Sequence, residues 1–268
     1  MGHMDYVMGR TDHETRRLML QGEVYRPHSK HLFTVAGIAP GMRVLDVGCG
    51  AGDVSLILAE LVGPTGSVIG VDADPAVLEV ARERARGLPN VEFAQALLPE
   101  VALDGPVDAL AGRLILIHLP DPVAAVRVLS RHLRPGGVVT FQDFDLKGVR
   151  TVPSTPLVAG LLDRMAEAMR AGGADPDSGE QLYRIFRQAG LDVAGIAGAT
   201  PAGSADSAVV PYAAATVVSL APLLEKLGLV TAAELDPDTL LDRMRAELAA
   251  ADAVLYAPEL MAVWATVS

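Results

Sequence analysis

The sequence predicts an α/β fold built around a parallel sheet, and three observations support this prediction. From residue 42 onward, short apolar runs alternate with stretches of helical length, which is typical of strands and helices that follow one another in a parallel sheet. The first run, 43–47, leads directly into a glycine-rich turn. Another run, 108–117, is apolar almost throughout, as expected for a strand that is buried on both faces.

Local signals place the elements of this alternating region. Strands are predicted at 43–47, 67–71, 91–94, 108–117 and 138–141. Helices between them are predicted at 54–61, 75–86 and 122–134. The last two helices each follow an aspartate that can cap the helix and begin with a proline that suits its first turn. Crossover connections between parallel strands are right-handed.

The alternation changes on both sides of this region. At the N-terminus, Thr11 and Glu14 form a capping-box pattern for a helix to about residue 25, and Pro27 begins a second helical piece that ends near Gly37. A second capping box, at Ser178, marks another helix start. After residue 145 we predict helices at 155–170, 178–190, 209–227 and 237–252, and strands at 191–197 and 260–267.

The composition restricts the function classes that need consideration. The chain has 268 residues, half of them hydrophobic, and a formal charge of −11. Because this balance repels a phosphate backbone, a nucleic-acid substrate is not expected. The single cysteine excludes an internal disulfide and suits a reducing cytoplasm. The longest uncharged run, 207–224, contains two prolines and several polar residues, so we expect no membrane span.

The turn after the first strand carries glycines at every second position, namely Gly48, Gly50 and Gly52. Glycines there let the backbone approach a ligand closely, and the following helix offers unpaired N–H groups. A dinucleotide fingerprint would need a further glycine where Asp53 stands. Asp46, just before the turn, suits a cationic ligand and would repel a pyrophosphate. Asp72 ends the next strand, at the position where such folds bind ribose hydroxyls.

Four motifs in this order resemble those of class I methyltransferases that use S-adenosylmethionine (SAM). The segment 46–52 resembles their first motif, 70–75 the following acidic motif, and 108–122 and 133–137 the later motifs. The resemblance covers about residues 43–144. The remainder resembles, more loosely, small-molecule methyltransferases of bacterial secondary metabolism. The family resemblance implies a Rossmann-like, seven-stranded sheet that is parallel except for its last strand, which is antiparallel.

The resemblance also implies a division of the chain. Residues 1–4 look like an expression-vector remnant, and residues 5–40 would form a helical lid. The SAM-binding core would comprise residues 41–146, 178–200 and 258–268. The insertions 147–177 and 201–257 would form a helical cap.

The family's motifs imply which residues bind the methionine end of SAM. The backbone of the turn would contact it at Gly48, Cys49 and Gly50. Asp46 would act on the amino group of SAM, directly or through water. Gly112 and Arg113, which stand where the family has its residues after the fourth strand, would line the same end of the cofactor.

At the other end of the cofactor, Asp72 would hold the ribose hydroxyls, with Ala73 beside the adenine. The family usually has an acid after the third strand that binds the adenine amino group. This sequence has none there. Ala96 and Leu97 would instead hold the adenine through their backbone and by apolar packing.

Two residues are candidates for a general base. Methyl transfer from a sulfonium is an in-line displacement, so the protein mainly orients and desolvates the reactants. An acceptor that loses a proton needs a base, and His118 is the first candidate because histidine titrates near neutrality. Asp143, at the carboxyl edge of the sheet, is the second. His118 could equally cap its strand or touch only SAM, and Asp143 could cap a loop with Asp145 or join it in a divalent-metal site.

Several side chains outside the motifs could reach SAM or the acceptor. Tyr6, Tyr25 and His28 lie on the N-terminal segment, and Met165 and Met169 lie on the helix predicted at 155–170. Plain packing in the core or lid explains each of them equally well.

We therefore predict a SAM-dependent methyltransferase that acts on a small, apolar or aromatic metabolite at an oxygen, nitrogen or carbon atom. Three alternatives stay open: a protein of this fold that catalyses another reaction such as a cyclisation, a nicotinamide-dependent reductase, and a non-enzymatic ligand-binding module. Asp46 and Asp53 disfavour the reductase, as does Arg187, which stands where a Tyr183-based Tyr-x-x-x-Lys pair would need lysine. A homodimer is left open.

Overall fold

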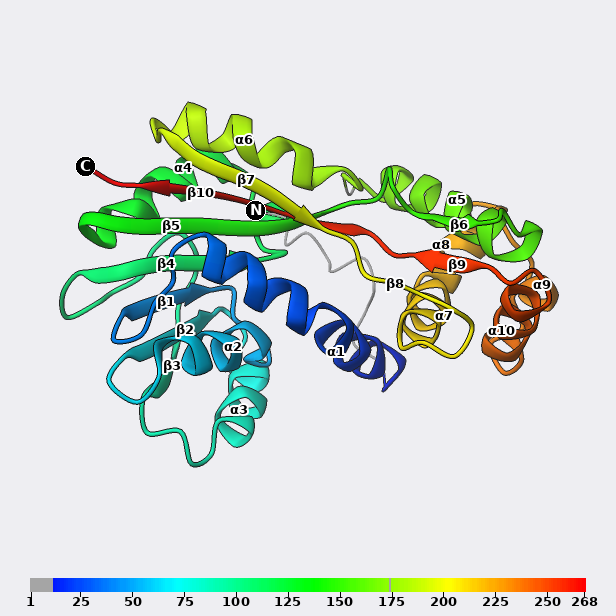
Figure 1. Cartoon of the computed structure of the whole chain (residues 1–268), viewed down its shortest axis with the longest axis horizontal. Helices are drawn as coiled ribbons and strands as arrows, with labels where there is room; N and C mark the ends of the chain where they lie inside the picture. Colours follow the sequence, from blue (N-terminus) through cyan, green and yellow to red (C-terminus); the bar gives the residue numbers. More distant parts are fainter. Residues whose placement is uncertain (1–11, 174) are drawn as a thin grey trace. The chain divides into compact units, whose positions relative to one another are not determined.

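A computed structural model describes residues 12–173 and 175–268, with side chains from residue 16 onward (Figure 1). The described chain divides into two compact units. The larger comprises residues 26–144, 178–199 and 260–268, and the smaller comprises the segment up to Tyr25 together with 145–177 and 200–259. Tyr6 and Thr11, two residues of the sequence predictions, lie outside the described residues.

The larger unit contains a seven-stranded sheet with the order β3-β2-β1-β4-β5-β10-β7. The strands are β1 (Arg43–Val47), β2 (Ser67–Asp72), β3 (Val91–Gln95), β4 (Val107–Arg113), β5 (Leu133–Asp145), β7 (Val193–Ala199) and β10 (Glu259–Thr266). Strands β1 to β5 pair in parallel, and β10 pairs antiparallel with β7. This arrangement confirms the predicted fold class, including the antiparallel last strand.

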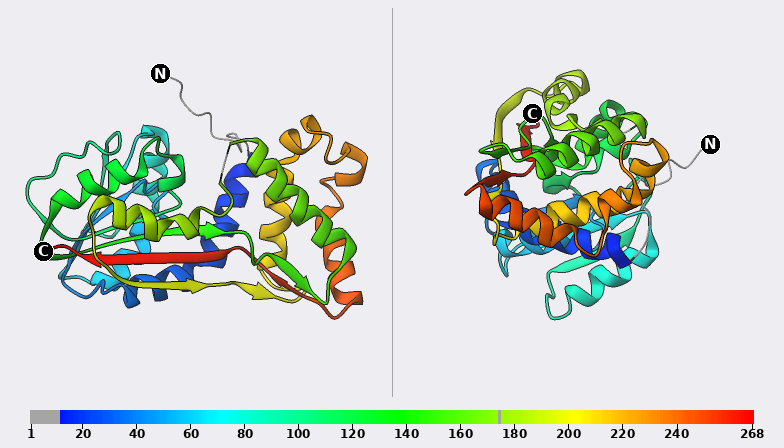
Figure 2. Two further views of the ribbon diagram at one scale, coloured as in Figure 1. Left: turned by 90° about the horizontal axis from the view of Figure 1, so that it is seen from above. Right: turned by 90° about the vertical axis from the view of Figure 1, so that its right-hand side faces the viewer.

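Helices pack on both faces of this sheet. On one face, the part of α1 (Asp12–Val35) that belongs to the larger unit and α2 (Asp53–Val62) bury Phe33, Ile57 and Leu58 against β1 and β4. On the other face lie α4 (Pro122–Leu129) and α6 (Ser178–Ala189), and Phe186 of α6 makes an edge-to-face contact with Phe141 of β5. Figure 2 (left) shows these two helices together beside β10. Each such buried side chain contributes about 1.5–3 kcal/mol.

Two of the predicted helix starts are confirmed by their caps. Asp74 precedes α3 (Pro75–Arg84) and accepts a hydrogen bond from Ala76 N (2.9 Å), and Asp121 accepts one from Ala124 N before α4 (2.8 Å). The prediction of a capping box at Ser178 was wrong in its detail. Ser178 is the first residue of α6 rather than its cap, and its hydroxyl donates to Asp143 Oδ1 (2.8 Å).

The N-terminal helix differs from the prediction. We expected two helical pieces separated at Pro27, but α1 is one helix of 24 residues with Pro27 inside it. An internal proline removes one helical hydrogen bond and disfavours the turn before it. Fully buried side chains on both sides of the proline, such as Tyr25 and Phe33, offset this cost. Tyr25 also donates its hydroxyl to Pro258 O (2.8 Å), within the smaller unit.

The apolar run at 108–117 is only partly a strand. Strand β4 ends at Arg113, Leu114 has a left-handed backbone (φ +56°), and a short 3₁₀ turn follows at Leu116–His118. Apolar composition alone does not mark where such a strand ends, because residues 114–117, which follow the strand, are also partly or fully buried. The shorter strand places Ile115 directly against the glycine turn.

The smaller unit contains helices, most of them in the predicted regions, and a short sheet that was not predicted from the sequence. Its helices are α5 (Pro156–Ala171), α7 (Val209–Ser219), α8 (Ala221–Lys226), α9 (Ala232–Leu235) and α10 (Leu240–Ala250). The strands β6 (Arg150–Val152), β8 (Ala202–Gly203) and β9 (Val254–Tyr256) pair antiparallel in the order β6-β9-β8. Met165 is buried in this unit, as the packing interpretation expects. The roles of lid and cap stay predictions.

Candidate functional site

The glycine turn connects β1 to α2 at the carboxyl edge of the sheet. Gly48 and Gly50 both have left-handed backbones (φ +67° and +52°), which strain any residue with a side chain. A Cβ at Gly48 would lie 2.4 Å from Ile115 Cγ1, whereas one at Gly50 would meet nothing within 4 Å. Gly48 is therefore needed for close packing, and Gly50 leaves its backbone open to a ligand.

Asp72 braces this turn from the end of β2. Its Oδ2 accepts a hydrogen bond from Gly50 N (2.9 Å), and its Oδ1 accepts one from Asp74 N (3.0 Å). Cys49 N in turn donates to Val71 O (3.0 Å). The turn is thus tied to the neighbouring strand at two successive residues, which fixes the backbone that would meet a ligand.

Asp46 is a buried carboxylate at the end of β1, beneath the turn. Its Oδ2 accepts a hydrogen bond from Ser55 Oγ (2.6 Å), but its Oδ1 is buried without a protein partner. Burial raises the pKa of Asp46 to about 7, against the opposing effects of the Ser55 hydrogen bond and the positive charge of Arg113. A buried acceptor of this kind is costly unless a donor or a cation reaches it. The site is therefore suited to a cationic group.

Arg113 lies at the end of β4, the strand that pairs directly with β1 and its Asp46. Its Nη1 donates to Ser29 Oγ on α1 (2.9 Å). Gly112, the residue before it, packs so tightly that a Cβ would lie 2.7 Å from the Phe141 ring. The structure thus brings Arg113 and Asp46 to the same edge of the sheet as the glycine turn, as the sequence predicts for the methionine end of a cofactor site.

The predicted adenine end has a different construction. Ala96 N donates to Asp72 O (2.9 Å), so this N–H is already used within the structure. Gln95, which stands near the family's usual acid, donates its side-chain amide to Ala73 O (2.9 Å). Leu97 is 71% exposed. Leu97 and Ala73 can offer apolar contact to an adenine, and binding of adenine by the Leu97 backbone stays a prediction.

The two candidate bases differ in their surroundings. His118 ends the 3₁₀ turn after β4 and is exposed, and desolvation by the surrounding protein lowers its pKa. A neutral imidazole, able to accept a proton, therefore prevails at pH 7. Asp143 is buried, and its Oδ1 accepts hydrogen bonds from Ser178 Oγ (2.8 Å) and Phe144 N (2.9 Å). These bonds give Asp143 a structural role at the start of α6.

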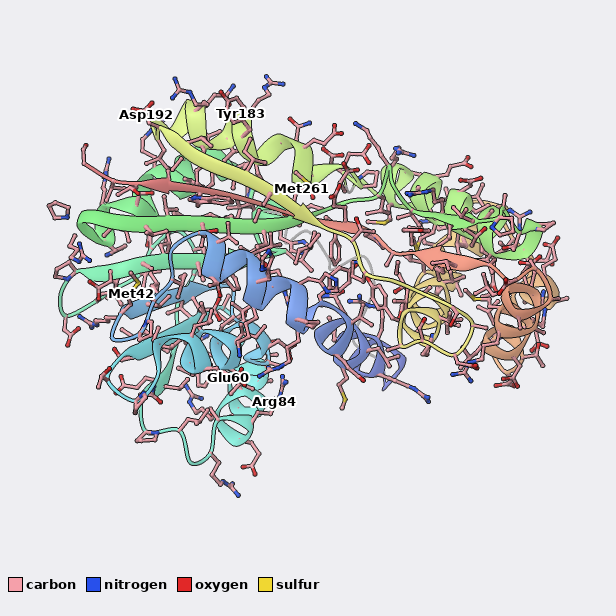
Figure 3. All side chains as sticks on the ribbon, in the orientation of Figure 1. Met42, Glu60, Arg84, Tyr183, Asp192 and Met261 are labelled. Carbon is pink, nitrogen blue, oxygen red and sulfur yellow. The ribbon has the colours of Figure 1, made fainter. Side chains whose placement is uncertain are left out.

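Arg84 is a residue near the site that the sequence analysis did not single out. Its guanidinium donates from α3 to Ala51 O in the glycine turn (2.7 Å) and to Asp53 Oδ1 at the start of α2 (2.6 Å); Figure 3 labels it. In the sequence, Arg84 belongs to the basic stretch 82–86, a pattern that is typical of a solvent-exposed helix face. No local pattern distinguishes it from its neighbours, because its partners lie more than thirty residues away.

Two kinds of feature are absent from the part of the chain that the structure describes. No group of three His, Cys, Asp or Glu side chains there could hold a metal ion. The helices of that part are also all too short or too polar to cross a membrane.

Comparison with known proteins assigns the family. A model of the methyltransferase domain matches residues 38–190, which include the glycine turn, Asp46, Asp72 and both candidate bases. The chain belongs to this methyltransferase family. Its cofactor is accordingly S-adenosylmethionine, as the motifs predict.

Individual relatives agree with this assignment. The chain is 33% identical over 118 residues to a demethylmenaquinone methyltransferase of Staphylococcus aureus, an alignment that covers 44% of this chain and 49% of that protein. The chain thus matches only about half the length of these curated relatives.

Solved structures share the fold at lower identity. The YcgJ protein of Bacillus subtilis superposes with a TM-score of 0.58 at 19% identity, over 90% of this chain and 99% of that one. A SAM-dependent methyltransferase of Aquifex aeolicus gives 0.54 at 22% identity, over 70% and 92%. The [4+2]-cyclase SpnF gives 0.56 at 19% identity, over 91% and 82%.

The residues present fit the cofactor. The unpartnered, buried Oδ1 of Asp46 can accept from a cationic ammonium group, and the open space beside Gly50 lets a ligand approach the turn. Asp72 keeps its carboxylate at the end of β2, where it can also accept from ribose hydroxyls.

Proposed function

We propose that this protein transfers a methyl group from SAM to a small, apolar or aromatic metabolite. The observation that carries the proposal is the buried carboxylate of Asp46, whose second oxygen has no protein partner, beneath a glycine turn with open space at Gly50. A dinucleotide's pyrophosphate would be repelled by this carboxylate, whereas the ammonium of SAM would neutralise it. The family match supports the same cofactor.

The chain's own residues would divide the work as follows. The backbone of the turn and Asp46 hold the amino-acid end of the cofactor, with Arg113 beside them, and Asp72 holds the ribose. SAM, when bound, supplies a methyl group on a positively charged sulfur. His118 is the residue proposed to accept a proton from the acceptor, because its lowered pKa keeps it neutral at physiological pH.

The acceptor is proposed to be small and apolar. The net charge of −11 disfavours a nucleic acid, and the relative from Staphylococcus aureus is named for a methyl transfer to demethylmenaquinone. A role in bacterial secondary metabolism rests on the sequence resemblance, and a cytoplasmic location rests on the single cysteine. Both are part of the proposal.

Thermal unfolding with different ligands tests the cofactor. We expect SAM and S-adenosylhomocysteine (SAH) to raise the Tm in a concentration-dependent way, since a ligand that binds only the folded state stabilises it by RT ln(1 + [L]/Kd). NAD(H) should leave the Tm unchanged. A rise with NAD(H) alone would contradict the proposal and favour a reductase.

Methyl transfer itself needs a second measurement. A panel of quinols, phenols and other small apolar acceptors is incubated with SAM labelled in its methyl group, and label in the product is measured by mass spectrometry. We expect transfer to at least one class, and reduced transfer in His118→Ala with unchanged SAH binding. Binding of SAM without transfer to any acceptor would favour a non-methylating reaction such as a cyclisation.

A further inference from the structure

A buried serine on α1 is held from two neighbouring strands of the sheet. Ser29 is fully buried, and its hydroxyl accepts a hydrogen bond from Arg113 Nη1 (2.9 Å). Its backbone oxygen accepts a second bond, from Gln142 Nε2 (3.3 Å). All three residues belong to the larger unit. Ser29 is therefore a fixed point of α1 at the ends of β4 and β5.

The two donors are themselves neighbours in the sheet. Arg113 on β4 is the register partner of Gln142 on β5, and Leu114 N donates to Gln142 O (2.8 Å) just beyond them. Gln142 is buried, and its Oε1 has no protein partner. The Gln142 side chain thus donates a hydrogen bond from its amide nitrogen to α1, while its amide oxygen accepts none from the protein. Ser29 is the common partner of both side chains.

Arg113 connects Ser29 to the carboxylate under the glycine turn. Asp46 on β1 is the register partner of Ala111 on β4, and Arg113 lies two residues further along the same strand. Residues two apart in a strand point to the same face, so Arg113 and Asp46 share one face of the sheet. The positive charge of Arg113 acts on the Asp46 carboxylate, and it opposes the effect of burial there.

An arginine side chain has many rotamers, and a fixed acceptor is needed to hold its guanidinium in one place. Ser29 Oγ supplies that acceptor from a buried position. We propose that Ser29 is a positioning residue for the amino-acid end of the cofactor, acting by fixing the guanidinium of Arg113 beside Asp46. This inference rests on the proposed function, since it assumes that SAM occupies the site. It makes α1 part of the cofactor site through a residue that no motif marks.

Binding of two ligands to Ser29→Ala separates positioning from stability. SAH carries the amino-acid end, whereas 5′-methylthioadenosine has the same adenosine and sulfur without it. We expect Ser29→Ala to weaken SAH binding about threefold to tenfold in calorimetry. The variant removes the hydrogen bond to the charged guanidinium of Arg113, which is then no longer held beside Asp46. Binding of 5′-methylthioadenosine should not change. A merely structural defect would weaken both ligands equally, and that result would overturn the proposal.

Thr34→Ala is the matched control. Thr34 also lies on α1, but its hydroxyl is exposed and donates to Lys30 O of the same helix (2.8 Å). This variant should bind SAH like the wild type. If Ser29→Ala does not fold, as judged by circular dichroism, Ser29→Cys replaces it, since a thiol keeps the volume but is a poor acceptor.

A double-mutant cycle tests whether Ser29 acts through Arg113. In the Arg113→Met background, Ser29→Ala should cause no further loss of SAH binding. An equal loss in both backgrounds would show that Ser29 acts independently, and would overturn the proposal. If the wild type binds neither SAM nor SAH, the proposed function itself fails. If the wild type binds and Ser29→Ala binds equally well, only the inference about Ser29 fails.

Discussion

At the scale of single residues, Asp46 is the group whose burial and charge most affect what the site can bind. It is buried, it has one hydrogen bond from Ser55, and its other oxygen has no protein partner. The sequence placed this acid correctly before the turn, because its position in the motif is local. The sequence could not show its unsatisfied oxygen or its pKa, since both depend on Ser55 and on packing from several strands.

The raised pKa of Asp46 predicts how stability depends on pH. Between about pH 4 and 7 the folded state keeps a proton that the unfolded state releases, so the free energy of unfolding falls as the pH rises through this window. The slope amounts to about 1.4 kcal/mol per pH unit at most. Asp46→Asn should lack this contribution. Urea unfolding of both proteins at pH 5 and pH 8 measures it.

The difference between the two proteins isolates Asp46, because the other titrating groups are common to both. We expect Asp46→Asn to gain stability relative to the wild type at pH 8, and to bind SAH more weakly there because the cationic partner loses its carboxylate. A parallel pH dependence of the two proteins would contradict the assigned pKa.

Cys49 is predicted to be unreactive although it lies in the glycine turn. It is buried, and burial with the nearby charges of Asp46 and Asp72 raises the pKa of its thiol far above the usual value. Because the thiolate is the reactive form, alkylation by iodoacetamide at pH 8 should be at least about 100-fold slower in the folded protein than in urea. Mass spectrometry of labelling over time measures this. Rapid labelling of the folded protein would mean that the turn opens.

At the scale of elements, the sequence predicted what short-range signals determine. Asp74 and Asp121 were placed as caps because a cap bonds only to the next few residues. The continuity of α1 across Pro27 and the end of β4 at Arg113 were not predicted, because burial in the folded protein decides both. Strands as short as β8 carry no periodic pattern, so only their partner in the folded structure defines them.

The contact of α3 with the glycine turn gives a prediction at this scale. Arg84→Met removes the bonds to Ala51 O and Asp53, so the turn should become less ordered and SAH binding should weaken about threefold to tenfold. Arg86→Met is the control, because Arg86 lies just beyond the end of α3 and pairs with Glu83, not with the glycine turn. Calorimetry at equal ionic strength compares them. Equal binding by both variants would show that α3 does not order the turn.

At the scale of the whole molecule, charge decides which acceptors can approach. The formal charge is −11. The positive charges of the densest basic stretch, 82–86, are balanced by nearby carboxylates. Its three arginines each form an ion pair with a carboxylate, Arg82 with Glu79, Arg84 with Asp53 and Arg86 with Glu83. These pairs leave that stretch without excess positive charge for a phosphate backbone.

We therefore expect no measurable binding of nucleic acid at physiological salt. Without a basic surface, a protein gains nothing from counterion release, which is the main source of non-specific affinity for nucleic acids. Fluorescence anisotropy of a labelled single-stranded RNA should show a Kd weaker than about 100 μM, the weak end of non-specific binding, and an excess of RNA should not compete with SAH. Tight, salt-dependent binding would mean that charges elsewhere form a patch, and it would move the proposed acceptor from small molecules to RNA.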